Sequence, residues 1–90
     1  MKTLPCVHMN GTSAQMLFDG YRRAYEACRD ALHAIEEIEF NARDYYPVHP
    51  NAWAEARAEM GMHVTHIAAA RDAFLAVAAH VQEVAGDRLK

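Results

Sequence analysis

The chain has 90 residues, 52% of them hydrophobic, and a formal net charge of −3. Residues 1–90 form one domain, and a domain this small buries only about two-thirds of the surface of its unfolded chain. Acidic and basic residues are interspersed, so the chain lacks the basic face that DNA or RNA binding requires. No apolar run is long enough to span a bilayer and no signal-peptide pattern opens the chain, so we expect a cytoplasmic protein with no membrane partner.

The first nine residues alternate weakly between apolar and polar types, which predicts a short extended segment able to form one strand. A lone strand needs a partner for its backbone groups, and the same strand of another subunit is one way to supply it. Asn10-Gly11 is typical of a turn. Thr12 followed by Gln15 makes a capping box, so we place the N-cap of the first helix at Thr12.

Two long segments carry apolar residues at alternating intervals of three and four. Such residues fall on one stripe of an α-helix, and that stripe must pack on another helix. The spacing predicts helices over residues 13–40 and 52–85, so the expected fold is all-α, an antiparallel two-helix hairpin behind a short N-terminal extended segment. The stripes comprise Leu17, Tyr21, Ala24, Cys28, Ala31, Ile35 and Ile38 in the first helix, and Trp53, Ala56, Met60, His63, Ile67, Ala70, Phe74, Val77, Val81 and Val84 in the second.

Glycine, proline and asparagine residues mark the boundaries and the interiors of these helices. Pro47 and Pro50 prevent a continuous helix through the connection. Asn51 is a suitable N-cap for the second helix, and Gly86 suits the residue that follows its C-terminal end. Gly20 and Gly61 lie inside the helices, where we expect the close approach of a neighbouring helix.

The apolar faces are wider than a lone pair of helices can bury, because each helix covers only one side of the other. We therefore expect a homo-oligomer, in which two or more hairpins associate into a helix bundle. The residues that flank the stripes and widen the apolar faces are Phe18, Tyr25, Leu32, Val64, Leu75 and Ala78.

The polar turn between the helices concentrates groups suited to a small ligand. Arg43 offers a planar fork of donors for a phosphate or carboxylate, and two adjacent tyrosines offer ring faces for stacking. Arg57, about one turn into the second helix, and the N–H groups that open that helix would add to an anion site. The candidate ligand-binding residues are Asn41, Arg43, Asp44, Tyr45, Tyr46 and Arg57, and together they suit a nucleotide-type molecule.

The same turn has a purely structural alternative. Arg43 and Asp44 would stiffen it by bonding to each other's backbone, or by pairing with Glu39 and Arg57. The two tyrosines would then only cap the end of the bundle. The sequence leaves both alternatives open.

Catalytic and metal-binding patterns are weak. No paired carboxylates flank a recognisable cleft, no Ser/His/Asp arrangement has a motif, and no phosphate-cradling glycine loop is present, so we expect no enzymatic activity, no catalytic residues and no cofactor. Glu59, His63 and His66 share one helix face, which is suitable spacing for a metal inside a bundle, but the Glu-x-x-His motif of di-iron bundles is absent. His63 on an apolar stripe is more typical of a hydrogen-bonded residue that fixes register, so no metal site is expected.

Two short motifs resemble a known group of proteins. Asn10-Gly11-Thr12-Ser13 opens the first helix, and Asn41-x-Arg43-Asp44-Tyr45-Tyr46 precedes the second. This pattern resembles a family of small hypothetical proteins encoded by tailed phages and prophages, and the resemblance covers nearly the whole chain. The family's turn has Pro and Gly where this chain has Phe40 and Ala42, and its Glu-His pair early in the second helix is Glu59-Met60 here. The resemblance implies a phage protein in the cytoplasm of a bacterial host, with no established activity.

Phage genomes carry small oligomeric helical proteins that sequester nucleotide signals of bacterial immunity. By this fold-level analogy we expect an anti-defence binding protein for a cyclic nucleotide or another nucleotide-derived small molecule. Its sites would form where one subunit's turn meets a neighbour, near the segment Asn10-Gly11-Thr12. The alternatives are a structural phage component, or a protein-interaction module that inhibits a host defence protein through an apolar face such as Phe18, Tyr25 and Leu32.

Overall fold

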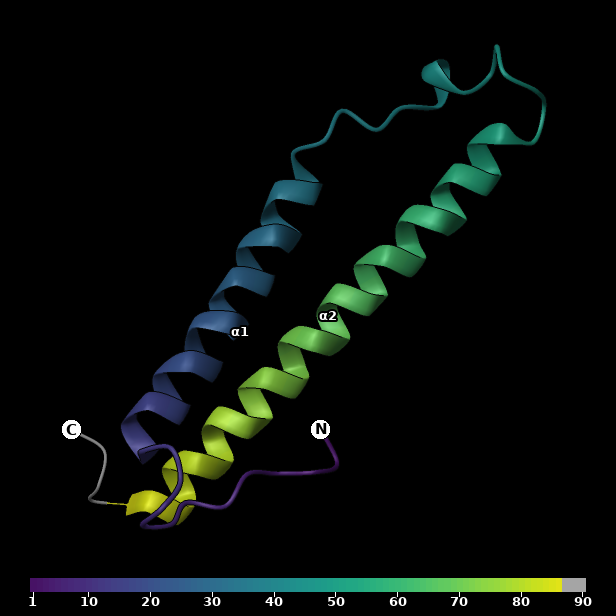
Figure 1. Cartoon of the computed structure of the whole chain (residues 1–90). Coiled ribbons are helices and arrows are strands. Elements are labelled where there is room, and N and C mark those ends of the chain that lie inside the picture. Colours follow the sequence, from purple (N-terminus) through teal and green to yellow (C-terminus); the bar gives the residue numbers. More distant parts are fainter. Residues whose placement is uncertain (87–90) are drawn as a thin grey trace.

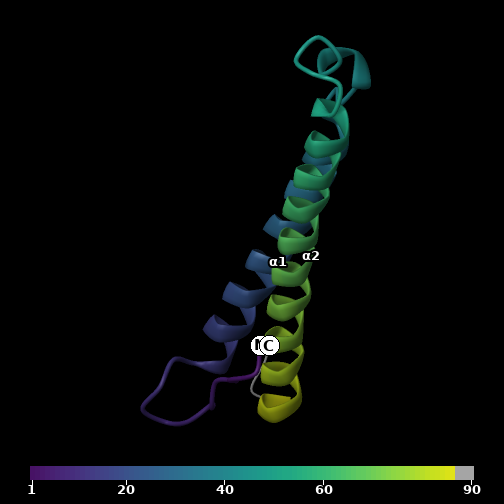
Figure 2. The same ribbon diagram turned by 90° about the vertical axis from the view of Figure 1, so that its right-hand side faces the viewer.

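Two antiparallel helices pack side by side in the computed structural model, which describes residues 1–86 (Figures 1 and 2). Helix α1 covers Ala14–Glu36, helix α2 covers Ala52–Ala85, and one turn of 3-10 helix, η1, covers Ala42–Asp44. The predicted all-α hairpin is therefore confirmed, in a molecule that measures 60 × 23 × 17 Å. Within the described residues, no helix combines the length and the hydrophobicity that a membrane crossing needs.

Helix α1 is capped by Ser13 rather than by Thr12 as predicted. The hydroxyl of Ser13 accepts a hydrogen bond from the N–H of Met16 at 3.1 Å, three residues along, which satisfies one of the unpaired donors at the helix start. The motif was thus correctly placed at the start of the helix, but the capping residue was wrong by one position.

Helix α1 also ends at Glu36, four residues before the predicted end at Phe40. The N–H groups of Glu37 and Ile38 bond to carbonyls three residues earlier, both at 3.1 Å, which tightens and closes the last turn. Negative charge is unfavourable at the C-terminal end of a helix, where the macrodipole is itself negative. The acidic run Glu36-Glu37-Ile38-Glu39 therefore disfavours a further turn of helix.

Helix α2 keeps its predicted bounds. Asn51 occupies the N-cap position, although its side chain makes no capping hydrogen bond and only its carbonyl accepts, from the N–H of Glu55 at 3.0 Å. At the other end Gly86 has a φ of +52°, in the region that side chains with a Cβ rarely adopt, and its N–H bonds to the carbonyl of Gln82. The predicted role of Gly86 as the helix terminator is confirmed.

The buried core lies at one end of the hairpin, where the chain begins and α2 finishes. We call residues 1–29 and 64–86 the base half and residues 30–63 the tip half. Val77 and Val81 are fully buried in the base half and pack with Ala14 and Ala85. The half-buried residues that close this core are Val7, Leu17, Phe18 and Tyr21.

Buried positions along α2 follow a period of 3.6 residues rather than a strict heptad. Ala85 is buried, whereas Val84, which the stripe predicted to be buried, is 51% exposed. A straight helix drifts by about 20° per heptad against a seven-residue repeat, so the drift between Trp53 and Val84 is roughly 90°. The prediction for Val84 was wrong because the strict heptad stripe turns away from α1 near the end of α2.

The N-terminal segment is extended, but no strand forms within residues 1–86. It crosses the base of α2 (Figure 1), where the carbonyl oxygen of Pro5 lies 3.2 Å from Nε2 of His80. A carbonyl can only accept, so the bonded nitrogen of His80 carries the proton. The segment therefore uses a helix side chain as its partner instead of a second strand.

The chain exposes more surface than a compact monomer of its mass. Its accessible surface is 6,617 Å², whereas about 5,300 Å² is typical for a globular monomer of this mass. Its radius of gyration is 18.8 Å, against roughly 12 Å for a compact domain of this length. The predicted oligomer stays a prediction, and this excess of surface is its main physical motivation.

Candidate functional site

The connection between the helices, residues 37–51, folds into a compact tip. The N–H groups of Tyr45 and Tyr46 both bond to the carbonyl of Ala42, at 2.9 and 3.1 Å, and these bonds close η1. The N–H of Val48 then bonds to the carbonyl of Tyr45 at 3.0 Å, which forms a second turn around Pro47. Local backbone hydrogen bonds therefore order the tip without help from α1.

Three rings hold the tip against the first turn of α2. The ring centroids of Phe40 and Trp53 lie 4.8 Å apart, and Tyr45 lies 5.7 Å from Phe40 and 5.6 Å from Trp53. These spacings fall in the favourable range for aromatic pairs. The guanidinium carbon of Arg57 lies 5.4 Å from the Trp53 ring centroid, so a cation–π contact extends the cluster. We call Phe40, Tyr45 and Trp53 the aromatic triangle.

The two adjacent tyrosines of the predicted site have different environments. Tyr45 is half-buried in the aromatic triangle, so its ring has a structural role. Tyr46 is 65% exposed, and none of the ring contacts found in residues 1–86 involves it. Of the two tyrosines, Tyr46 is thus the one that offers an open face for stacking.

The polar members of the predicted site are not gathered into one cluster within a single chain. Arg43 and Asp44 are exposed on η1, and within residues 1–86 neither forms an ion pair. The predicted pairing of Glu39 with Arg43 is not formed, because α1 ends before Glu39 and the two residues share no helix face. Asn41 instead donates to Glu39 at 3.5 Å, and Arg57 lies over Trp53. Their role in binding stays a prediction.

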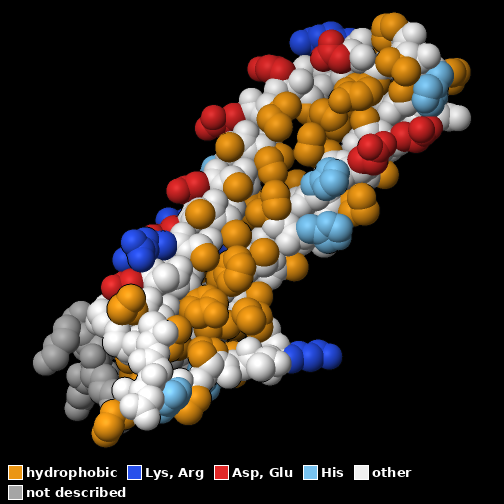
Figure 3. All heavy atoms as spheres, viewed as in Figure 1, with side chains coloured by type: hydrophobic (Ala, Val, Ile, Leu, Met, Phe, Trp, Pro, Cys, Tyr) orange, Lys and Arg blue, Asp and Glu red, His pale blue; other side chains and the backbone are white. Residues whose placement is uncertain are grey.

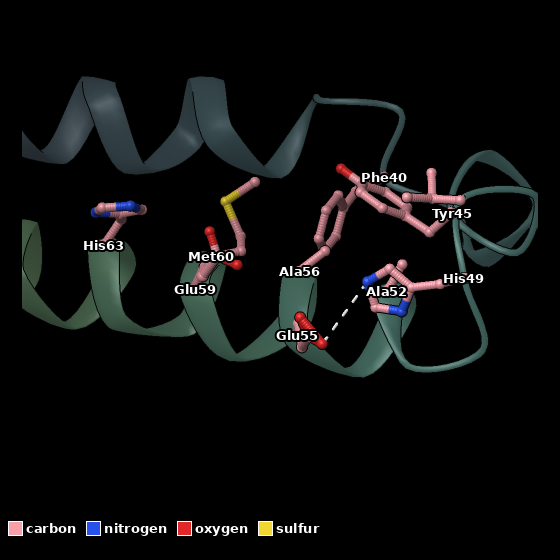
Figure 4. Close-up of a pocket in the computed structure, with 10 residues that line it drawn as sticks. Phe40, Tyr45, His49, Ala52, Glu55, Ala56, Glu59, Met60 and His63 are labelled. Atoms are coloured by element: carbon pink, nitrogen blue, oxygen red, sulfur yellow. Dashed lines mark ion pairs between the residues drawn. The ribbon is translucent and has the colours of Figure 1, made fainter.

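An open groove of about 400 Å³ lies under the tip, between the connection and the first turns of α2 (Figure 4). We call it the tip groove. Its floor is apolar, and the side chains of Met60 and His63 point from α2 toward α1. The residues that line it are Phe40, Tyr45, Val48, His49, Ala52, Glu55, Ala56, Glu59, Met60 and His63, of which only Tyr45 belongs to the predicted ligand-binding set.

His49 links the connection to α2 at the rim of this groove. Its Nδ1 accepts a hydrogen bond from the N–H of Asn51 at 3.2 Å, so in the neutral ring the proton sits on Nε2. That nitrogen faces Oε2 of Glu55 at 3.8 Å (Figure 4). Both side chains are about half exposed, so this contact stabilises the tip only weakly.

The electrostatics of the tip limit what the groove can hold. The rim carries the carboxylates of Glu55 and Glu59, so the groove disfavours a phosphate and favours a neutral or cationic apolar group. Within the described residues, no group of three His, Cys, Asp or Glu side chains is placed to hold a metal ion. An anion would have to bind on the outer side of the tip, where Arg43 is exposed.

Sequence reasoning missed the tip groove because the groove follows from the early end of α1. Since α1 stops at Glu36, a loop rather than a helix faces the first turns of α2. Two signals were present in the sequence. The acidic run at residues 36–39 opposes helix continuation, and Phe40 and Trp53 flank the turn as a pair of large aromatic residues.

Comparison with known proteins identifies no relative. No family model, no curated protein and no solved structure matches the chain. Any function proposed for it therefore rests on its own residues, on the resemblance of its two short motifs and on fold-level analogy.

Proposed function

We propose that this chain is a non-enzymatic, phage-encoded binding protein that sequesters a small nucleotide-type molecule at the exposed end of its tip. One observation carries the proposal. Arg43 and Tyr46 are exposed on a turn whose backbone is held by η1 and by the aromatic triangle. A guanidinium fork and an aromatic face that are already ordered lose less conformational freedom on binding.

Each residue of the turn has a distinct role in this proposal. Arg43 donates two parallel hydrogen bonds to a phosphate, and Tyr46 stacks on a base. Asp44 accepts a hydrogen bond from a ribose hydroxyl or a base edge. Tyr45 and Arg57 support the turn through Trp53. The ligand is bound without being cleaved, so the protein acts by lowering the concentration of the unbound signal.

The charge of the tip requires a contribution from a neighbouring hairpin. Around the turn the carboxylates outnumber the arginines, so one tip alone repels a polyanion at long range. A neighbour that brings backbone N–H groups or cations to Arg43 would offset this repulsion. The carboxylates between residues 36 and 59 are Glu36, Glu37, Glu39, Asp44, Glu55 and Glu59, and the arginines are Arg43 and Arg57.

Native mass spectrometry with a panel of cyclic dinucleotides, cyclic trinucleotides and cyclic ADP-ribose-type molecules tests the proposal. We expect one panel member to add to a defined oligomer in integer steps. Arg43→Ala should weaken that binding by about tenfold or more, because a charge-assisted hydrogen bond is lost. Arg22→Ala removes an exposed arginine that pairs with Glu26 in α1, and this control should bind normally. Undiminished binding by Arg43→Ala, or no adduct across the panel, would contradict the proposal.

A second candidate function is a protein-interaction module that inhibits a host defence protein. The observation that favours it is the acidic tip half, where seven exposed carboxylates outnumber two arginines. Such a surface suits a basic partner protein and steers its association. A purified partner that binds the Arg43→Ala variant but not the triple variant Glu36→Lys, Glu37→Lys, Glu39→Lys would support this function over ligand sequestration.

A further inference from the structure

One face of the hairpin is apolar along its whole length (Figure 3). The tip groove lies near the tip of this face, and a second open groove of about 260 Å³, which we call the base groove, lies near the base. The base groove has an almost wholly apolar lining, formed by Met16, Leu17, Gly20, Tyr21, Ala24 and Phe74. We call the surface that contains both grooves the front face.

Small residues of α1 leave the front face uncovered. A methyl group placed on Gly20 would meet nothing within 4 Å, so the close approach expected at this glycine is not made by α2. The same line of the helix continues through Ala27 and Ala34, which are also exposed. A glycine inside a helix costs about 1 kcal/mol relative to alanine, yet nothing within the described chain uses the space it opens.

The excess of accessible surface area gives an estimate of the area that a partner would bury. The chain exposes 6,617 Å², which is about 1,300 Å² more than a compact monomer of this mass. Obligate dimers bury roughly 1,000 to 2,500 Å² on each partner, so one protein surface as long as the hairpin would account for the excess. A small ligand would cover far less than this area, whereas a second protein chain could cover it.

Charge is distributed unequally along the hairpin, and the difference fixes an orientation. A second copy in parallel orientation would place the acidic tip half on another acidic tip half, whereas an antiparallel copy places it on a base half in which cations slightly outnumber carboxylates. In the tip half the carboxylates are Asp30, Glu36, Glu37, Glu39, Asp44, Glu55 and Glu59, and the arginines are Arg43 and Arg57. In the described base half the cations are Lys2, Arg22, Arg23, Arg29 and Arg71, and the carboxylates are Asp19, Glu26, Asp72 and Glu83.

We propose that the front face is covered by a second copy of this chain in antiparallel orientation, so that two hairpins form a four-helix bundle. The ring contact of Tyr21 with Phe74, at 6.2 Å between centroids, sets Gly20 at the level of Leu75. At a rise of 1.5 Å per residue, Leu75 and His63 each lie roughly 10 Å along the helix axis from the middle of α2, in opposite directions. A two-fold axis near the middle of α2 therefore places the base groove of each copy on the inner end of the tip groove of the other, near His63.

This arrangement also completes the proposed ligand site. The tip of one hairpin extends to the base end of its partner, beside the turn Asn10-Gly11-Thr12. Exposed backbone groups of that turn would then border Arg43 and Tyr46. This consequence rests on the proposed function, whereas the antiparallel pairing does not.

A pair of matched glycine variants tests the pairing in the absence of any ligand. Sedimentation velocity of the wild type should give about twice the monomer mass of 10.1 kDa, or a higher even multiple. Gly20→Glu should raise the dissociation constant of the pair by about tenfold or more, since it fills the contact and brings a carboxylate toward Glu59 of the other copy. In one chain this substitution meets open space, so the hairpin itself stays folded.

Gly61→Glu is the matched control. Gly61 is also exposed in the middle of a helix, and a methyl group placed on it would meet nothing within 4 Å. It precedes His63 by two residues and therefore lies on the opposite side of α2. It should assemble like the wild type. A wild-type monomer at every concentration, or equal assembly of Gly20→Glu and wild type, would overturn the proposal.

Thiol cross-linking tests the orientation. In a background of Cys6→Ser and Cys28→Ala, a mixture of Gly20→Cys and His63→Cys chains treated with a short bismaleimide should give the mixed dimer. His63→Cys chains alone should give little, because their thiols lie far apart along an antiparallel pair. Efficient linking of His63→Cys to itself, or no linking in the mixture, would overturn the antiparallel arrangement. Assembly without binding of any panel molecule would instead contradict only the proposed ligand.

Discussion

The base and the tip of the hairpin differ in how completely they cover the apolar side of α2. At the base, α1 and the N-terminal segment together enclose Val77 and Val81, which have no exposed surface. At the tip, Ala52 is the only buried residue in the described residues 30–63, and the tip groove stays open beside it. The base therefore resembles the interior of a small domain, whereas the tip resembles half of an interface.

The difference comes from the number of elements present at each end. At the base three segments pack together, because the N-terminal segment crosses α2 and the carbonyl of Pro5 bonds to His80. The tip has α2 and a loop, since α1 has already ended at Glu36. Two helices cover each other on one side only, so a hairpin closes its core where a third element is available. At the tip, the proposed second copy of the chain would supply that cover.

The largest expected effect is at the base core. Val77→Asp buries a carboxylate at a fully enclosed position with no partner, and should destabilise the chain by at least about 4 kcal/mol. Ala79→Asp makes a similar change at an exposed position of the same helix, and should change stability by less than about 1 kcal/mol. Urea unfolding followed by circular dichroism measures both. Similar losses in the two variants would contradict the location of the core.

A smaller and more local effect is expected at the aromatic triangle. Phe40→Ala removes two ring contacts from a half-buried site and should cost about 2 kcal/mol. Hydrogen exchange should speed up in residues 41–51, while the amides around Val77 stay protected. Tyr46→Ala changes a ring that is 65% exposed and should leave the exchange pattern intact. Equal effects of the two variants would show that the triangle does not hold the tip.

The start of α1 should show an effect of about 1 kcal/mol. Ser13→Ala removes the hydroxyl that accepts from Met16 and should lower the free energy of unfolding by roughly that amount. Thr12→Ala should have almost no effect, although the sequence motif made Thr12 the capping residue. A larger loss of unfolding free energy in Thr12→Ala than in Ser13→Ala would show that Thr12 is the capping residue after all.

The smallest expected effect concerns the N-terminal segment. His80→Ala removes the donor to the carbonyl of Pro5 and should cost about 0.5–1 kcal/mol. The loss should appear as faster proteolysis within residues 1–9, because the segment detaches from α2 before the hairpin unfolds. Proteolysis at the wild-type rate would mean that Val7, not His80, holds the segment in place.

The sequence predicted the elements well wherever a local rule decided the outcome. Gly86 ends α2 because the backbone there has a positive φ, and Asn51 occupies the N-cap position of α2 as expected. Two errors arose because a regular pattern was extended too far along a helix. Val84 is exposed because a helical period of 3.6 residues accumulates drift against a heptad. Helix α1 ends at Glu36 and not at the predicted Phe40, in a run of carboxylates that is unfavourable for the helix dipole.

The candidate site shows the same limit more sharply. Tyr45 and Tyr46 are adjacent and chemically identical, and no local pattern distinguishes them. The structure separates them through Phe40 and Trp53, whose rings take up Tyr45 and leave Tyr46 exposed. Sequence reasoning missed the tip groove for a related reason, since the groove depends on how far α1 extends relative to α2.

If the front face is an interface, one hairpin is only part of the assembled protein. The most direct test measures molar mass by light scattering and the unfolding temperature across a hundredfold range of protein concentration. If a second copy covers the front face, the mass should be an even multiple of 10.1 kDa, and the unfolding temperature should rise with concentration. A mass of 10.1 kDa throughout, with a constant unfolding temperature, would contradict the claim.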